Sequence, residues 1–323
     1  MSLVDELKSK IRVEKPEIVF PEGDDTRILR AAVRLEQDGD LKPIVLGSKE
    51  KLAEIAKEEC IDISNLEIID PLNYDDIDNM VSAFVERRKG KATGEKAREI
   101  LKDHNYFGTM LVYLNKAKGL VSGAAHTTAD TVRPALQIIK TKPEYSRCSG
   151  AFLMLRDEEK YLMADCAINI DLDAEGLAEV AVVSNETAKS FGIDPKIAML
   201  SFSTKGSASH ERVDMVAEAT RLAHEKNPDM AVDGELQFDA AFVPEVAKKK
   251  APNSDVAGHA NVFVFPNIEA GNIGYKLAQR YGGFEAIGPI LQGLNAPVND
   301  LSRGCVEDEV YSLAIITAAQ AVL

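Results

Sequence analysis

The stretch Ile18-Val19-Phe20-Pro21-Glu22-Gly23-Asp24-Asp25-Thr26-Arg27 decides the fold class. A short apolar, β-branched run ends in a polar turn, and a helical pattern follows, which is typical of a strand that leads into a helix. The same order recurs after Ile44–Leu46 and after Leu66–Ile69. Repetition of this unit predicts a largely parallel sheet that is covered by helices.

The second half of the chain repeats the pattern. Strands are predicted at Ala151–Leu155, Tyr161–Ala164, Ile197–Leu200 and Val262–Phe265. The first two of these runs are joined by Arg156–Glu159, a short polar segment that is typical of a hairpin connection. We therefore expect one antiparallel pair in an otherwise α/β arrangement.

The length of 323 residues exceeds the size at which a single hydrophobic core usually keeps growing, so two domains are expected. A helical pattern ends within Lys140–Ser149, and the chain is expected to return to the first domain near Gln292–Pro297. The predicted fold is therefore two three-layer α/β domains around an interdomain cleft. Residues 1–144 and 293–323 form the first, discontinuous domain, and residues 145–292 form the second. Ligands of such sheets bind beyond the carboxyl ends of the strands.

Composition excludes several classes of function. The net charge of −14 argues against binding to nucleic acids or to membrane surfaces, since both are bound through excess Lys and Arg. The four cysteines form no CxxC pair and no cluster with histidines, so no metal site is expected. The N-terminal segment lacks an apolar core of signal-peptide length, and no apolar run is long enough to span a membrane. We expect a soluble cytoplasmic protein.

The C-terminal segment offers the first candidate site. Asn299-Asp300-Leu301-Ser302-Arg303-Gly304-Cys305 is a polar loop, and the following Val306–Leu323 has helical spacing. A loop at a helix N-terminus presents free backbone N–H groups, and Arg303 would add a positive charge. This combination favours an anion site, although a plain capped terminal helix explains the same pattern.

Three further loops carry residues suited to binding or catalysis. The loop at 20–27 places Arg27 at a helix start, where it is either an anion ligand or a solvated side chain. The loop at 122–134 holds several hydroxyls, one histidine and one arginine, namely Ser122, His126, Thr127, Thr128 and Arg133. Its small residues would let a ligand approach the backbone, and His126 is either an acid–base group or a structural hydrogen-bonding residue. The loop at 201–210 contains Lys205 and Ser207 but not the spacing of a Walker A motif.

Local patterns also predict how the loop at 122–134 leads into its helix. Thr127 and Asp130 have the spacing of a capping box with aspartate in the third position. Pro134 is then expected near the first helical turn, where a residue without an N–H is tolerated. No GxGxxG, HExxH or GxSxG motif is present, which disfavours dinucleotide, zinc-protease and α/β-hydrolase chemistry.

Long motifs give the chain a family resemblance. The segments at 121–142 and 297–305, together with 200–207, 233–241 and 261–266, closely resemble those of bacterial phosphate acetyltransferases, also called phosphotransacetylases. The resemblance spans nearly the whole chain. It implies reversible transfer of an acetyl group between acetyl phosphate and coenzyme A, with no metal and no tightly bound cofactor. It also implies a fold similar to that of the isocitrate and isopropylmalate dehydrogenases, and a homodimer.

The resemblance implies roles for individual residues. Ser302 and Arg303 match the active-site serine and arginine of the family, and Arg133 matches an arginine associated with coenzyme A. Further functional arginines are matched by Arg27, by Arg280 and by Arg88, or less closely by Arg87. The remaining predicted substrate contacts are the loop residues Ser122, His126, Thr127, Thr128, Lys205 and Ser207.

One position departs from the family pattern. An aspartate seven residues after the active-site serine is the expected base for the coenzyme A thiol, and the gapless position here is Glu309. Asp308 is the alternative base. A free thiol has a pKa of about 8.5 and reacts as the thiolate, so a base within reach is useful. The expected reaction is direct attack of the sulfur on acetyl phosphate in a ternary complex; the competing route is an acetyl-enzyme on Cys305 or Cys166.

Other functional classes stay open at this stage. A phosphate butyryltransferase differs from an acetyltransferase mainly in pocket volume, which the sequence does not show. A non-catalytic acetyl-CoA-binding module is the alternative from a different class, but Ser302, Arg303 and the nearby carboxylates favour catalysis. A dehydrogenase rests on fold analogy alone.

Overall fold

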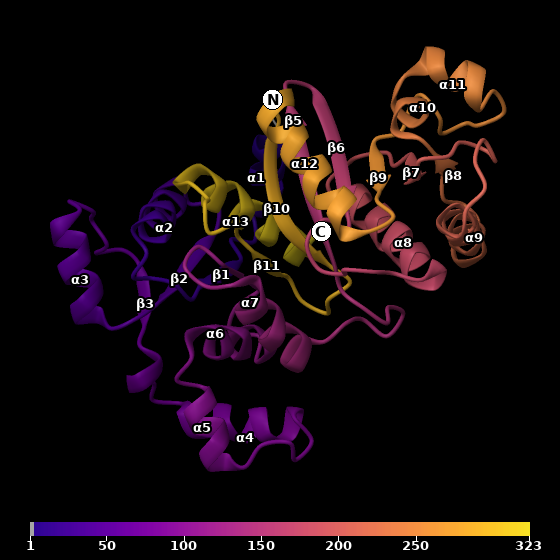
Figure 1. Cartoon of the computed structure of the whole chain (residues 1–323). Helices are drawn as coiled ribbons and strands as arrows, with labels where there is room; N and C mark the ends of the chain where they lie inside the picture. Colours follow the sequence, from indigo (N-terminus) through magenta and orange to yellow (C-terminus); the bar gives the residue numbers. More distant parts are fainter. Residues whose placement is uncertain (1–2) are drawn as a thin grey trace. The chain divides into compact units, whose positions relative to one another are not determined.

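The computed structural model describes residues 3–323; the first two residues of the expected first domain lie outside the described residues. The chain forms two compact units (Figure 1). The first contains the residues up to Lys142 together with Leu294–Leu323, and the second contains Pro143–Gly293.

The first unit is built on a parallel sheet of five strands in the order β11-β4-β1-β2-β3. Its strands are β1 (Glu17–Phe20), β2 (Lys42–Leu46), β3 (Glu67–Ile69), β4 (Gly119–Ser122) and β11 (Val298–Asp300). All residues of β4 and β11 are buried, as expected for strands that are covered on both faces. Because β11, β4 and β1 are neighbours, the loops that follow them meet at one edge of the sheet.

Helices cover both faces of this sheet. They are α1 (Leu3–Ile11), α2 (Thr26–Asp38), α3 (Lys49–Glu58), α4 (Ile77–Arg87), α5 (Gly94–Ile100), α6 (His104–Tyr113), α7 (Thr128–Pro134) and α13 (Glu307–Val322), with the 3₁₀ turn η1 (Pro71–Asn73) and the π-helical η2 (Ala135–Ile139). α1 and α2 pack against α13, and α6 packs against α7 (Figure 1). Val310, Leu313 and Thr317 of α13 are buried, which confirms their predicted helical spacing, whereas Val306, predicted with them, lies before the helix and is exposed.

The second unit is built on a mixed sheet of six strands in the order β10-β5-β6-β9-β7-β8. The strands are β5 (Ser149–Arg156), β6 (Glu159–Ala164), β7 (Ile197–Leu200), β8 (Val232–Leu236), β9 (Val262–Val264) and β10 (Glu285–Gln292). β5 and β6 pair antiparallel across the turn at 157–158, so the predicted hairpin is confirmed. The helices are α8 (Ala174–Ser190), α9 (Glu211–Lys226), α10 (Phe238–Phe242), α11 (Pro244–Lys250) and α12 (Ile268–Gly282).

One local prediction is wrong. Pro134 is the last residue of α7 and lies beyond its first turn. Proline has no N–H to donate within the helix. After it the helix passes into the wider π-helical η2, which ends at Ile139 and is followed by Lys140 with a positive φ of 66°.

Candidate functional site

The site is built where three loops meet at the carboxyl edge of the first unit's sheet. They follow β1, β4 and β11, and each contains residues that the sequence had singled out. Arg27 lies in the first turn of α2, directly after the first loop, and its guanidinium connects all three. It donates from Nη2 to the Ala124 carbonyl (2.7 Å) and from Nη1 to the carbonyls of Arg303 and Cys305 (2.9 Å each).

The remaining donors of Arg27 are held by a neighbour. Nε and Nη2 donate to the two carboxylate oxygens of Asp25, at 3.0 and 2.7 Å. The guanidinium lowers the pKa of Asp25, and Asp25 in turn raises the pKa of Arg27. A guanidinium has five N–H donors, and five protein oxygens together with the Cys305 Sγ accept from this one. In this conformation Arg27 positions the loops, and a direct contact with substrate would require it to release one of them.

The Ser302–Arg303 segment is exposed at the end of β11. The Ser302 Oγ accepts the Gly304 N–H at 3.3 Å, and the Cys305 N–H closes the turn on the Ser302 carbonyl at 2.9 Å. Arg303 is exposed, and within residues 3–323 its guanidinium makes no ion pair or hydrogen bond. Its backbone is fixed by Arg27 while its charge stays available to an anion.

The two predicted bases have different surroundings. The Asp308 carboxylate forms an ion pair with Arg34 at 2.6 Å, and 78% of its side chain is exposed. Glu309 accepts the Val306 N–H at 3.1 Å, so it caps the first turn of α13. Only Glu309 is thus tied to the loop that carries Ser302.

The loop after β4 is shaped by Glu22, a residue that the sequence had not singled out. The Glu22 side chain is fully buried and accepts the N–H groups of four consecutive residues, Gly123 to His126, at 2.8–2.9 Å. Its Oε1 also lies 2.7 Å from His126 Nδ1. The sequence had left these N–H groups open to a ligand anion, but an internal carboxylate occupies them. No local sequence pattern predicts the contact between Glu22 and this loop, because the partners lie about 100 positions apart.

Gly123 allows the loops after β4 and β11 to touch. Its φ of 110° is disfavoured for residues with a side chain, and a Cβ there would lie 2.6 Å from the Leu301 N and 2.7 Å from the Leu301 O. The Leu301 N–H also donates to the Ser122 carbonyl at 2.7 Å. A glycine is therefore required for this close approach.

Asp300 is the second buried carboxylate of the site. It is fully buried at the end of β11, and the hydroxyls of Thr128 and Thr131 lie near it without normal hydrogen-bond geometry. Burial raises the pKa of Asp300 to about 6, and the negative charge of Glu22 adds to the shift. This carboxylate sits directly before the Ser302–Arg303 turn.

The residues predicted in the loop after β4 divide into two groups. Ser122 is fully buried in β4, so direct contact between its hydroxyl and a substrate does not fit this structure. His126, Thr127 and Thr128 are exposed. The Thr127 N–H and hydroxyl both donate to Asp130, at 3.2 and 2.7 Å, which confirms the predicted cap.

The arginines of the first unit also divide into two groups, those that hold the backbone and those that are free to bind a ligand. The Arg87 side chain donates to the Ile138 and Ile139 carbonyls at 2.5 and 2.9 Å, so it is a structural residue. Within the described part of the chain, the guanidinium groups of Arg88 and Arg133 make no ion pair or hydrogen bond. These two remain available for a ligand.

The other predicted contacts belong to the second unit. Lys205 forms an ion pair with Asp233 and donates to the Gly234 carbonyl at 2.9 Å, while Ser207 Oγ accepts the Thr204 N–H at 3.0 Å. Arg280 is exposed on α12.

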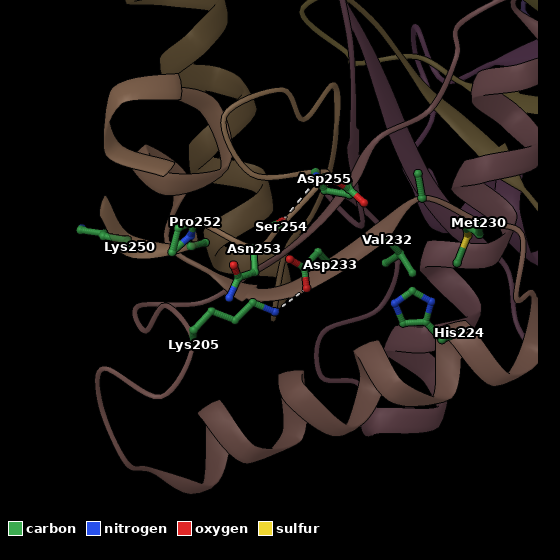
Figure 2. A pocket seen from close by; sticks show the side chains of 13 residues that line it. Lys205, His224, Met230, Val232, Asp233, Lys250, Pro252, Asn253, Ser254 and Asp255 are labelled. Carbon is green, nitrogen blue, oxygen red and sulfur yellow. Dashed lines mark hydrogen bonds and ion pairs between the residues drawn. The ribbon is translucent and has the colours of Figure 1, made fainter. Parts of the chain in front are cut away.

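Lys205 also lines a cavity of about 630 Å³ beside β8 (Figure 2). Lys250, at the same cavity, is paired with Asp239 at 2.9 Å. Both lysines are thus already paired with carboxylates, so neither has a free charge to bind an anion in this cavity.

Comparison with known proteins identifies the family. A family model described as phosphate acetyl/butaryl transferase matches residues 2–318. The chain belongs to this family. The transferase is 59% identical to a phosphate acetyltransferase of Bacillus subtilis over 315 residues, covering 98% of both chains. It is 58% identical to a phosphate acetyltransferase of Staphylococcus epidermidis over 324 residues, covering 99% of this chain and 98% of the relative.

Solved structures agree with this membership. A phosphotransacetylase from Streptococcus pyogenes has 60% identity and a TM-score of 0.95, covering 100% of this transferase and 99% of that chain. One from Staphylococcus aureus has 58% identity and a TM-score of 0.93, covering 99% and 98%. A branched-chain phosphotransacylase from Enterococcus faecalis, at 19% identity and a TM-score of 0.70, shares the fold, covering 95% and 99%.

Within residues 3–323 of the transferase, no helix is long and apolar enough to cross a membrane. No group of three His, Cys, Asp or Glu side chains in that range is arranged to hold a metal ion.

Proposed function

We propose that the chain is a phosphate acetyltransferase, which reversibly transfers an acetyl group between acetyl phosphate and coenzyme A. Relatives that are 58–59% identical to this chain over nearly their whole length carry that name. The observation that carries the proposal is the exposed Arg303 guanidinium, whose backbone Arg27 holds at the carboxyl edge of the sheet. An unpaired guanidinium on a fixed backbone suits a phosphoryl group.

The proposed reaction is direct attack of the coenzyme A sulfur on the acetyl carbonyl carbon. Arg303 binds the phosphate that departs, and the exposed Ser302 hydroxyl donates to the acyl oxygen or the phosphate. Glu309 takes the thiol proton, because Asp308 is engaged with Arg34. Glu309 already contacts the N-terminus of α13 next to the Ser302 turn.

The thiols of the protein fit a covalent route poorly. Cys305 is buried, and this burial raises the pKa of its thiol to about 11 although Arg27 opposes the shift. Burial also raises the pKa of Cys166 well above its usual value. Both thiols are therefore protonated near neutral pH, whereas a nucleophilic cysteine needs its thiolate.

A basic cluster supports a coenzyme A subsite in the first unit. The pKa of Lys140 is lowered, mainly by the charge of Arg87, with further contributions from burial, Lys89 and Arg88. Such a cluster stands out on a chain of net charge −14. We assign the phosphates of coenzyme A to Arg88 and to Arg133, both of which have free guanidinium groups.

The predicted roles of Lys205, Ser207 and Arg280 in substrate binding remain proposals. For Lys205, binding would require exchange of its ion pair with Asp233 for a substrate phosphate. A homodimer and a cytoplasmic location are proposals as well, and sedimentation equilibrium would test the first.

The function is tested by the initial rate of acetyl-CoA formation from acetyl phosphate and coenzyme A. Arg303→Ala should lower kcat by orders of magnitude, with Arg34→Ala as an exposed arginine control. Butyryl phosphate in parallel separates the acetyl from the butyryl activity. Unchanged turnover by Arg303→Ala would remove the Ser302–Arg303 loop from the mechanism.

A further inference from the structure

Four consecutive backbone N–H groups of the loop after β4 donate to one carboxylate. Glu22 Oε2 accepts from Gly123 and Ala124, and Oε1 accepts from Ala125 and His126, all at 2.8–2.9 Å. Consecutive N–H groups of this kind form an anion-binding concavity, and here the anion is part of the protein. Four such bonds fix the path of the loop without help from the His126 ring.

The His126 ring makes a fifth contact with the same carboxylate. Nδ1 lies 2.7 Å from Glu22 Oε1. An ionised carboxylate only accepts hydrogen bonds, so Nδ1 carries the proton and Nε2 is the nitrogen left for a ligand. The Glu22 side chain is fully buried, whereas 43% of the His126 side chain is exposed. A buried carboxylate that orients an exposed imidazole is the arrangement of an acid–base pair.

The pair lies beside the turn that carries Arg303. One guanidinium, that of Arg27, holds the Ala124 carbonyl at 2.7 Å and the Arg303 carbonyl at 2.9 Å. His126 follows Ala124 by two residues, a backbone span of at most about 7 Å. The His126 imidazole and Arg303, which is proposed to bind the phosphate, are therefore both attached to backbone that Arg27 holds in place.

We propose that His126 carries the proton on the phosphate side of the reaction and that Glu22 is its positioning residue. This inference rests on the proposed function. When acetyl phosphate is formed, a phosphate oxygen attacks the thioester carbon and its proton passes to His126 Nε2. The C–S bond breaks, and the thiolate leaves with the electron pair and takes a proton from Glu309. In the other direction the imidazolium returns its proton to the departing phosphate oxygen, while Glu309 accepts the thiol proton.

Two carboxylates face the His126 ring. Glu22 comes from the loop after β1, and Asp130, on α7, interacts with the ring electrostatically. Asp130 is fixed by its hydrogen bonds to Thr127, so it acts on the ring through its charge alone. Glu22 alone of these two makes a hydrogen bond to the imidazole.

His126→Asn is the direct test, because the asparagine amide can replace the Nδ1 hydrogen bond to Glu22 but cannot carry a proton. General acid–base catalysis contributes about 10² to 10⁴-fold, so kcat should fall by at least about 100-fold in both directions. The KM for coenzyme A should change little. The pH–kcat profile of the variant should lack one limb that the wild-type profile has.

A kcat of His126→Asn near that of the wild type, or a retained limb, would overturn the inference. Arg303→Ala is assayed beside it. Its inactivity together with a normal His126→Asn refutes the inference but leaves the proposed function intact.

The role of Glu22 is tested without turnover. In ¹⁵N spectra of the wild-type imidazole, the proton of the neutral ring should reside on Nδ1 of His126. Glu22→Gln turns one acceptor into an N–H₂ donor that faces two backbone N–H groups, so it should disorder the loop and release this tautomer preference. A wild-type ring protonated on Nε2 instead would contradict the assignment.

Discussion

Replacing Asp300 with asparagine should stabilise the protein at neutral pH. The carboxylate is fully buried, and burial, aided by the charge of Glu22, raises its pKa from 3.8 to about 6. One pKa unit corresponds to about 1.36 kcal/mol, so a charged Asp300 costs about 3 kcal/mol at pH 7. Asparagine keeps the shape and removes the charge, and the nearby Thr128 and Thr131 hydroxyls can accept its N–H groups.

The sign of the pH dependence follows from the direction of the shift. Between about pH 4 and pH 6 the folded state holds the Asp300 proton while the unfolded chain has lost it. The stability contributed by this residue is thus present below about pH 4 and is lost as the pH rises through 6. The advantage of Asp300→Asn should be about 3 kcal/mol at pH 7 and less than about 1 kcal/mol at pH 4.

Urea unfolding of both proteins at pH 4 and pH 7 measures this difference. The exposed Asp171→Asn serves as the control, since it changes the net charge of −14 equally without a buried site. A variant that is no more stable than the wild type at pH 7 would refute the reasoning. So would an advantage that stays the same at pH 4.

Three further outcomes are expected. Arg88→Ala should raise the KM for coenzyme A, most strongly at low salt. Arg87→Ala should mainly lower the melting temperature, because it leaves the part-buried Ile138 carbonyl without its side-chain donor and the Ile139 carbonyl with Asn295 alone; steady-state kinetics and thermal melts separate the two variants. Cys305→Ser should keep most of the wild-type kcat and leave no acetyl-enzyme after rapid quench, and loss of turnover with a correctly folded variant would revive the covalent route. Glu309→Gln should lower kcat by about 100-fold or more, and Asp308→Asn should stay within a factor of a few; the reverse order would make Asp308 the base.

Apolar, β-branched runs were enough to predict several strands of each sheet. The runs at Ile18–Phe20 and Ile44–Leu46 became β1 and β2, and the hairpin of β5 and β6 was predicted from its polar connection. In these segments burial and local propensity favour the same structure.

β4, β8, β10 and β11 were not predicted, and β8 and β11 carry polar side chains. β11 contains Asn299 and Asp300, both fully buried, and β8 contains Asp233 and Glu235. Asn299 is accommodated by hydrogen bonds to Thr317 and Gln320 of α13, which only the folded chain brings together. Polar side chains at such positions conceal a strand because their partners are distant in sequence.

The candidate site was predicted in part. Position after a strand and residue type pointed to Arg303 and His126. The same reasoning offered Ser122 as a ligand contact, although its hydroxyl is buried. Glu22 gave no signal because its role depends on a loop 100 residues away. Residue type identified the charged groups, and only the three-dimensional contacts showed which of them hold the loops.

The most direct test of the proposed mechanism is the rate of acetyl-CoA formation from acetyl phosphate and coenzyme A by the wild type, Arg303→Ala and His126→Asn at equal concentration. We expect rapid turnover by the wild type, with acetyl phosphate preferred over butyryl phosphate, and losses of about 100-fold or more in both variants. Wild-type turnover in Arg303→Ala would contradict the proposed mechanism.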